Sequence, residues 1–150
     1  MSIRMSVAKH ERLSALGCDS LPAMKILIVD DDADMRKTVA DIFAESRLRI
    51  VTARNGTIAL QCLDTFVPDV VITDIYMPRM DGIEMIRSMR QKHPDIGILA
   101  MTGGCEAYAD IGLEPVTPDM IYALGADIML RKRFREDERC DAICLAARRI

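Results

Sequence analysis

Five short apolar runs, separated by segments with helical patterning, are the feature of this 150-residue sequence that most limits its fold. The first run, residues 26–29, is continuously apolar and ends abruptly in acids, which is typical of a buried parallel strand. The predicted strands are residues 26–29, 49–53, 69–73, 96–101 and 127–131.

The segments between these runs carry apolar residues at helical spacing. Met35, Val39 and Ile42, with Phe43 beside them, fall on one face of a helix. The other predicted helices are residues 57–66 (Ile58, Leu63 and Phe66 inward), residues 83–92 (Ile83, Ile86 and Met89 inward), a short helix that Thr117 and Pro118 begin and Gly125 closes, and residues 135–149. Strands that alternate with helices predict an α/β fold: a doubly wound, five-stranded parallel sheet with helices on both faces.

Length and composition predict one intracellular domain. Residues 1–23 lack a sustained period and read as a flexible tail, so the folded domain is expected over 24–150. The net charge of −3 gives no basic face for direct DNA binding. The five cysteines form no CxxC pair, and no run has the length of a signal peptide core or a membrane span. These observations predict a cytoplasmic protein that makes no membrane contact.

Chemistry-bearing residues gather where the predicted strands end. Ligands bind beyond the carboxyl ends of the strands in an open α/β sheet, and the residues there are Asp30, Asp31, Asp74, Thr102 and Lys132. Three converging carboxylates repel one another unless a cation lies among them, and oxygen ligands in a hydrated site suit Mg²⁺. With Lys132 and the Thr102 hydroxyl nearby, the set predicts phosphoryl transfer through an aspartyl-phosphate at Asp74.

Each of these residues also has a simpler interpretation when taken alone. Asp32 and Asp34 suit the start of a helix, where the helix dipole favours acids. A threonine before two glycines is commonly a turn, and a lysine after a strand is commonly a solvated charge. The phosphoryl-transfer interpretation therefore depends on the combination.

That combination resembles a response-regulator receiver domain of the single-domain, chemotaxis-regulator type, over residues 24–149. The resemblance implies a flavodoxin-like fold. The motifs that carry it are Lys25-Ile-Leu-Ile-Val-Asp-Asp31, Val71-Ile-Thr-Asp-Ile-Tyr-Met-Pro-Arg-Met-Asp-Gly82, Met101-Thr-Gly103 and Gly125-Ala through Lys132.

The resemblance implies a role for each matching residue. Asp74 matches the phosphorylated aspartate. Asp31 matches the acid that binds Mg²⁺ directly, Asp30 the acid that acts through a bound water, and the backbone carbonyl of Tyr76 the third protein ligand. Thr102 and Lys132 match the switch hydroxyl and the lysine that pair with the phosphoryl group.

The resemblance also implies partners. A sensor histidine kinase or a histidine phosphotransfer protein would donate the phosphoryl group in a two-component phosphorelay. A downstream protein target is expected on the surface formed by residues 103–134. The sequence thus predicts a stand-alone receiver domain, not an enzyme beyond its own phosphorylation and dephosphorylation.

Three features depart from the family pattern. Arg133 stands where the family has a proline after the lysine, and since a cis bond before a non-proline residue costs about 3 kcal/mol, a trans bond is expected. Met129 stands where the family carries an aromatic residue. The segment between Thr102 and Gly125 is longer than is usual, and its glycines and prolines favour an irregular loop. These departures predict an altered switch or an unusual partner.

Two other functions stay open at this point. One is a small phosphatase resembling haloacid-dehalogenase-like hydrolases, since Asp30 and Asp32 form an Asp-x-Asp after the first strand. The other is a pseudo-receiver that acts only through protein contacts. A calcium loop is rejected, because Met35 and Asp41 stand where that loop needs glycine and glutamate.

Overall fold

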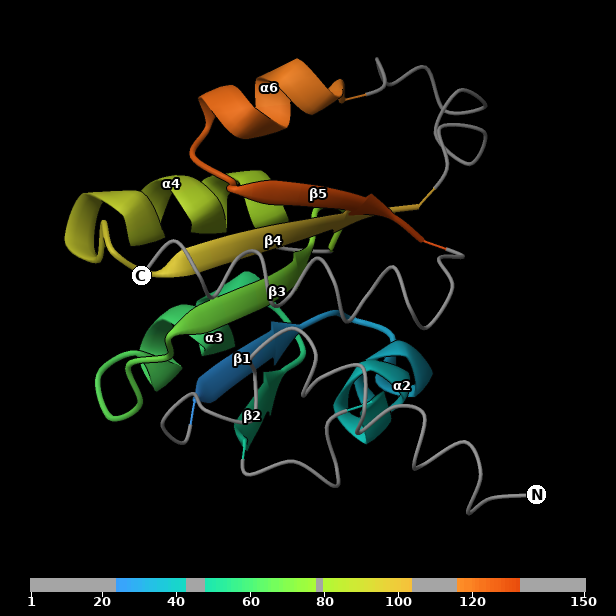
Figure 1. Ribbon diagram of the computed structural model, residues 1–150, viewed down its shortest axis with the longest axis vertical. Coiled ribbons are helices and arrows are strands. Elements are labelled where there is room, and N and C mark those ends of the chain that lie inside the picture. Colours follow the sequence, from blue (N-terminus) through green and yellow to red (C-terminus); the bar gives the residue numbers. More distant parts are fainter. Residues whose placement is uncertain (1–23, 43–47, 78–79, 104–115, 133–150) are drawn as a thin grey trace, which may run out of the picture.

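A five-stranded, all-parallel sheet forms the centre of the protein. A computed structural model of the chain describes residues 24–42, 48–77, 80–103 and 116–132, and these contain the sheet and four helices (Figure 1). The strand order is β2-β1-β3-β4-β5. The strands are β1 (Lys25–Val29), β2 (Arg49–Ala53), β3 (Val70–Asp74), β4 (Gly97–Thr102) and β5 (Ile128–Arg131).

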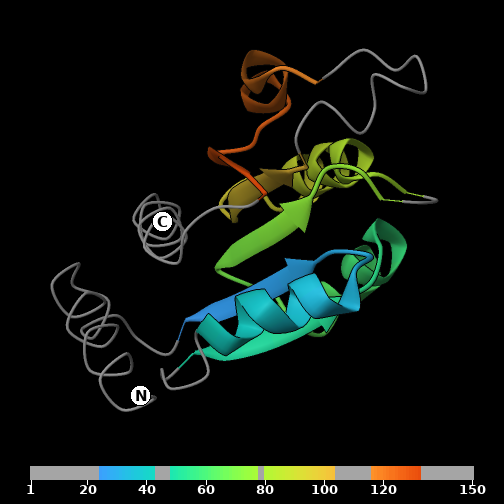
Figure 2. The same ribbon diagram turned by 90° about the vertical axis from the view of Figure 1, so that its right-hand side faces the viewer.

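Helices cover both faces of this sheet. Figures 1 and 2 show α2 on one face and α3 and α4 on the other, with α6 beside β5. The helices are α2 (Ala33–Ile42), α3 (Gly56–Cys62), α4 (Gly82–Lys92) and α6 (Pro118–Ala123). The predicted doubly wound architecture is therefore confirmed.

The alternation of side chains along the strands explains the two layers. Ile26 and Ile28 of β1 point into the cluster that includes Val39 of α2. Leu27 and Val29 point into the opposite cluster, which α3, α4 and α6 complete. Successive residues of a strand face opposite sides, so a continuously apolar strand fits only a sheet that is buried on both faces.

Local signals set the helix ends. The side chain of Asn55 accepts a hydrogen bond from the amide of Ile58 and caps α3, and Asp81 caps α4 in the same way. Thr117 caps α6. Gly125 follows α6 with a φ of 111°, a conformation that side chains with a Cβ rarely adopt. The predicted beginning and end of this helix are confirmed.

The second predicted helix was too long. The sequence predicted residues 57–66, whereas α3 ends at Cys62 and a turn follows. Leu63 and Phe66 nevertheless lie in the core, because the turn is closed by a hydrogen bond from the Phe66 amide to the Cys62 carbonyl. Leu63 and Phe66 have the spacing of a helix in the sequence, but a turn rather than a helix buries them.

Other differences are smaller. The third, fourth and fifth strands each begin one residue later than predicted. In α4, Met85 is fully buried although the sequence analysis did not place it inward, and Ile83 is only half-buried. The predicted helix over 135–149, the tail over 1–23 and the side chain of Phe43 lie outside the described residues.

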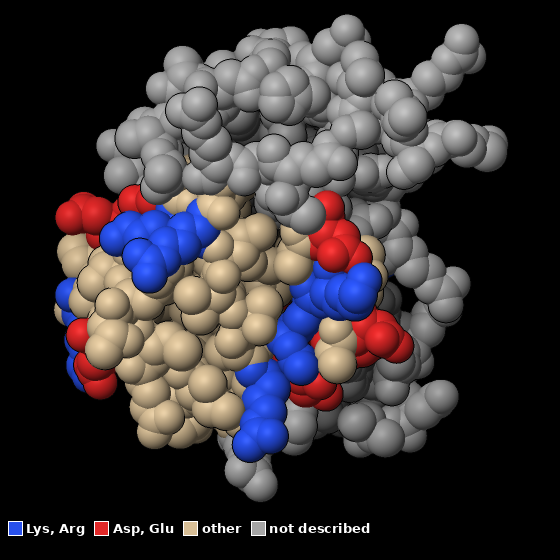
Figure 3. Space-filling model, turned by 90° about the horizontal axis from the view of Figure 1, so that it is seen from below, with Lys and Arg blue, Asp and Glu red and all other residues tan. Residues whose placement is uncertain are grey.

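Two surface observations complete the description. Within the described residues, no helix has both the length and the apolar character needed to span a bilayer. On the face in Figure 3, Lys and Arg lie beside Asp and Glu around a largely uncharged middle. The described atoms on that face therefore form no patch of a single charge sign.

Candidate acidic phosphoryl-transfer site

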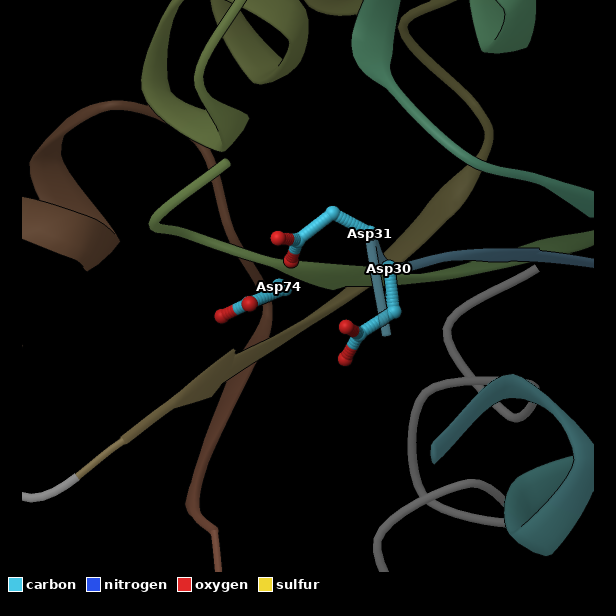
Figure 4. A group of neighbouring side chains, drawn as sticks. All are labelled: Asp30, Asp31 and Asp74. Carbon is cyan, nitrogen blue, oxygen red and sulfur yellow. The ribbon is translucent and has the colours of Figure 1, made fainter. Parts of the chain in front are cut away.

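Three aspartates meet at the carboxyl ends of β1 and β3. Asp30 follows β1 and is completely buried, and its backbone amide donates to the carbonyl of Ala53. Asp74 is the last residue of β3 and is 3% exposed, whereas Asp31 is exposed. One carboxylate oxygen from each aspartate lies within 4.8 Å of the others (Figure 4). The adjacent carboxyl ends of β1 and β3 therefore bring the three aspartate side chains together, as the sequence predicted.

Lys132 bridges two of these carboxylates. Its Nζ atom lies 2.7 Å from Oδ2 of Asp74 and 3.0 Å from Oδ2 of Asp30. The pairing of β5 with β4 brings it there, because Arg131 lies opposite Thr102 and the amide of Lys132 donates to the Thr102 carbonyl. Lys132, which follows Asp74 by 58 positions in the sequence, is thereby held beside it.

Burial and charge act against each other on the ionisation of this pair. Burial raises the pKa of Asp74 to about 6, although the hydrogen bond and the charge of Lys132 oppose this rise. Burial lowers the pKa of Lys132, but the hydrogen bond to Asp74 and the charges of Asp74 and Asp30 outweigh this effect, so that the pKa lies above its ordinary value. At neutral pH the pair is an ammonium ion beside a carboxylate of raised basicity.

One carboxylate oxygen in the site lacks a hydrogen bond. Oδ1 of Asp30 accepts from the amide of Asp32 at 2.9 Å, while the buried Oδ2 makes no hydrogen bond within the described part of the chain. Its proximity to Lys132 is an ion pair without hydrogen-bond geometry. The Lys132 ammonium offsets part of the charge on this buried oxygen, and a bound metal cation would give it a further partner.

The donor set suits Mg²⁺. The oxygens come from three carboxylates, and the exposure of Asp31 leaves one side accessible to water. Mg²⁺ prefers oxygen ligands and keeps several waters, so a partly open acidic site fits it better than a closed site of nitrogen or sulfur ligands. The residues present therefore fit the ion that the sequence predicted.

Tyr76 and Thr102 lie beside this cluster. The backbone amide of Tyr76 donates to Oδ1 of Asp74 at 3.4 Å, so its peptide group borders the carboxylate. Thr102 ends β4 and is buried, but no described hydrogen bond joins its hydroxyl to Asp74. The role of the Tyr76 carbonyl as a metal ligand and the role of the Thr102 hydroxyl as a switch therefore stay predictions.

Other residues singled out in the sequence lie elsewhere. The carboxylate of Asp32 accepts from the amide of Asp34 at 2.9 Å, which confirms its place at the start of α2. Met129 is half-buried against the core cluster of α3, α4 and α6. Arg133 and most of the long connection, residues 104–115, lie outside the described residues.

The sequence analysis missed Arg36. Its guanidinium NH1 donates to the backbone carbonyls of Asp30, at 2.7 Å, and Asp31, at 3.1 Å. This contact fixes the loop that carries both acids to the first turns of α2. A basic residue about one helical turn after an acidic N-cap was the available signal, because it can reach back to the loop.

The role of Gly82 was also missed. A Cβ atom there would overlap the carbonyl oxygen of Asp74 and lie 2.8 Å from the Cα atom of Ile75. The Gly82 amide donates to the carbonyl of Ile75 at 2.8 Å. This close approach of α4 to the end of β3 requires glycine. The Asp81-Gly82 pair was predicted only to be a loop, since a close approach cannot be read from sequence spacing.

Comparisons with known proteins find related sequences and structures. A family model described as the response regulator receiver domain matches residues 26–143. The chain is 35% identical over 130 residues to a protein-glutamate methylesterase/protein-glutamine glutaminase 2 of Oleidesulfovibrio alaskensis, covering 83% of this chain and 36% of that protein. It is 32% identical over 125 residues to the DNA-binding transcriptional regulator NtrC of Escherichia coli, covering 83% of this chain and 24% of that protein.

Similarity extends to solved structures. The chemotaxis response regulator CheY4 of Vibrio cholerae superposes with a TM-score of 0.70 at 24% identity, covering 83% of this chain and 99% of that chain. At this identity the similarity concerns the fold. The chain spans only about a third and a quarter of the two curated relatives above, so the match does not extend to the remainder of either protein.

Proposed function

The chain belongs to the response regulator receiver domain family, and on that basis we propose that it accepts a phosphoryl group on Asp74 in an Mg²⁺-dependent two-component phosphorelay. The observation that carries the proposal is the environment of Asp74: a buried carboxylate, 2.7 Å from the Lys132 ammonium, with two further carboxylates beside it. This environment combines a nucleophile with the charges that phosphoryl transfer needs.

The reaction would proceed at one oxygen of Asp74. That oxygen attacks the phosphorus of a phosphohistidine, a P–O bond forms, and the P–N bond breaks with its electron pair left on the imidazole nitrogen. Lys132 is placed to move its charge from the carboxylate to the phosphoryl oxygens. When bound by Asp30, Asp31 and Asp74, Mg²⁺ supplies further positive charge to these oxygens.

The geometry favours Asp74 over Asp30 as the nucleophile. Asp30 is completely buried, whereas Asp74 retains 3% exposure and lies closer to the Lys132 ammonium, at 2.7 Å against 3.0 Å. Asp32, which an Asp-x-Asp phosphatase needs as its second acid, is exposed and caps α2. This arrangement gives no support to the phosphatase alternative. The pseudo-receiver alternative is disfavoured because the charged residues of the pocket are all present.

Partners follow from the family only in outline. Receiver domains interact with histidine kinases and downstream effectors. We propose a sensor histidine kinase or a histidine phosphotransfer protein as donor, and a protein target on the surface of residues 103–134. Methylester hydrolysis and DNA binding, which the names of the two relatives mention, are not proposed for this chain, because the matches cover only part of those proteins. The stand-alone arrangement, the domain start at Met24 and the cytoplasmic location stay predictions.

Phosphoramidate tests the proposal, since its P–N bond resembles that of phosphohistidine. We expect intact-mass measurement to show the gain of one phosphoryl group in the presence of Mg²⁺, and no gain after EDTA treatment. Asp74→Asn should abolish the gain, whereas Asp95→Asn, an exposed acid before β4, should retain it. An unmodified, folded wild-type protein would contradict the proposal, and steady phosphate release that Asp30→Asn abolishes and Asp74→Asn retains would favour the phosphatase.

A further inference from the structure

Tyr76 connects the acidic pocket to the beginning of α6. Its phenolic oxygen accepts a hydrogen bond of 3.1 Å from the backbone amide of Val116, a residue 40 positions along the chain. Val116 directly precedes Thr117, the N-cap of α6. At its other end, the Tyr76 backbone amide donates to Oδ1 of Asp74. One residue therefore contacts both the proposed phosphorylation site and the start of a helix on a different part of the sheet.

We propose that Tyr76 is a positioning residue that couples occupancy of the acidic pocket to the position of Val116 and the start of α6. The proposal rests on the function proposed above, because it needs Mg²⁺ or a phosphoryl group to occupy that pocket. It adds a specific residue, a specific hydrogen bond and a specific recipient of the signal.

The packing of Tyr76 makes such coupling physically reasonable. Tyr76 and Val116 are both half-buried and pack against the same core cluster, which includes Ile121 of α6. A phenol ring held on its sides moves as a rigid body, so a change in the backbone beside Asp74 displaces the hydroxyl at the far end. Because the Val116 amide donates to that hydroxyl, the displacement reaches α6.

The Tyr76 hydroxyl ties the start of α6 to the Asp74 side of the pocket, because the amide of Val116 donates to it. Removing this hydroxyl leaves the ring, its packing and the backbone contact with Asp74 in place.

A purely structural reading makes a different prediction. If the hydrogen bond only stabilises the fold, its loss lowers stability by the same amount whether the pocket is empty or loaded. If it couples the two regions, its loss changes how Val116 responds to loading. The response of the Val116 amide when the pocket is filled, and not the stability of the variant, therefore distinguishes a coupling role from a purely structural one.

Amide NMR spectra of the full-length chain test the proposal. Spectra are recorded while Mg²⁺ alone is added, and again with Mg²⁺ and beryllium fluoride. In the wild type we expect the amides of residues 74–76 and of Val116 to shift together with the same midpoint. In Tyr76→Phe the amides of residues 74–76 should still respond, whereas the response of Val116 should be lost.

The matched control is Tyr122→Phe, which removes the same hydroxyl from a tyrosine that is 47% exposed on α6. It should behave as the wild type. A Val116 amide that stays unchanged in the wild type while residues 74–76 respond would overturn the coupling and leave the proposed function intact, as would an undiminished response in Tyr76→Phe. If residues 74–76 themselves fail to respond to either addition, the proposed function fails and the coupling falls with it.

Discussion

A Cβ atom on Gly82 would overlap the backbone carbonyl oxygen of Asp74, so the first residue of α4 and the last residue of β3 are fitted to each other. Both overlapping groups belong to the backbone and cannot move aside by changing a rotamer. The position of the phosphoryl acceptor in the proposed reaction thus depends on a residue that carries no side chain.

Replacing Gly82 by alanine should therefore disturb both stability and phosphorylation. We expect Gly82→Ala to lower the free energy of unfolding by about 1–3 kcal/mol, because the added methyl group forces the backbone apart. Phosphorylation by phosphoramidate should slow as well, since Asp74 is displaced. Urea denaturation and intact-mass time courses measure the two effects.

Gly103 provides the matched control for this change. A Cβ atom there meets nothing within 4 Å. Gly103→Ala should stay close to the wild type in stability. Equal destabilisation by the two substitutions would show that the close approach of Gly82 to Asp74 is not the cause.

The raised pKa of Asp74 predicts an unusual dependence of stability on pH. The folded-state pKa of about 6 lies above the ordinary value of 3.8, so folding favours the protonated acid. This contribution to stability is fully present below pH 3.8 and is lost as the pH rises through about 6. Asp74→Asn lacks it. In EDTA, the stability of the variant relative to the wild type should therefore increase by roughly 2 kcal/mol between pH 4.5 and 7.5.

Urea denaturation of both proteins across this pH range measures the difference. A stability difference that stays constant with pH would mean that the carboxyl group of Asp74 is not desolvated as the structure indicates. A saturating concentration of Mg²⁺ should reduce the effect, because a cation favours the ionised carboxylate.

Arg36 should help to position the proposed metal ligands Asp30 and Asp31, because it binds their backbone carbonyls. Arg36→Ala removes the hydrogen bonds to the carbonyls of Asp30 and Asp31 and loosens the loop that carries them. We expect the dissociation constant for Mg²⁺, measured by titration calorimetry, to rise about tenfold, as for other residues that orient ligands. Lys37→Ala, which removes an exposed neighbour on the same helix, should leave it nearly unchanged. Similar values for the two variants would exclude this role.

Arg90 should matter for stability and not for phosphoryl chemistry. Its guanidinium group donates to the carbonyls of Gly125, Pro94 and Ile96 and pairs with Asp127 at 2.7 Å. These contacts join the end of α4 to the β4 and β5 side of the sheet, away from Asp74.

Truncating Arg90 to alanine should lower the free energy of unfolding by about 2–4 kcal/mol, because it leaves partly buried acceptors and a carboxylate without their donor. Arg87→Ala, an exposed arginine on the same helix, should cost less than about 0.5 kcal/mol. Chemical denaturation measures both values. A small effect at Arg90 would mean that water replaces the guanidinium at no cost.

Strand residues made the fold predictable from the sequence. The apolar run before Asp30 and the acid at Asp74 indicate both a buried strand and its carboxyl end, so the sheet and the gathering of acids follow from the same pattern. Helix ends with a capping residue, such as Thr117, were predicted correctly for the same local reason.

The remaining features depend on contacts between distant segments. The clash that reserves position 82 for glycine, the reach of Arg36 back to two carbonyls and the bond from Val116 to Tyr76 arise only after folding. Periodicity also fails where a turn buries apolar residues, as it does after Cys62. Sequence spacing carries no information on the approaches of Gly82 and Val116, and for Arg36 it offers only the position of a basic residue one helical turn after an acidic N-cap.

The location of the phosphoryl group tests the central claim most directly. The full-length chain is incubated with acetyl phosphate and Mg²⁺, the acyl phosphate is reduced with borohydride to homoserine, and the modified residue is found by peptide mass spectrometry. We predict homoserine at position 74 and none in Asp74→Asn. Homoserine at Asp30 or Asp31, or none anywhere in a folded protein, would contradict the account.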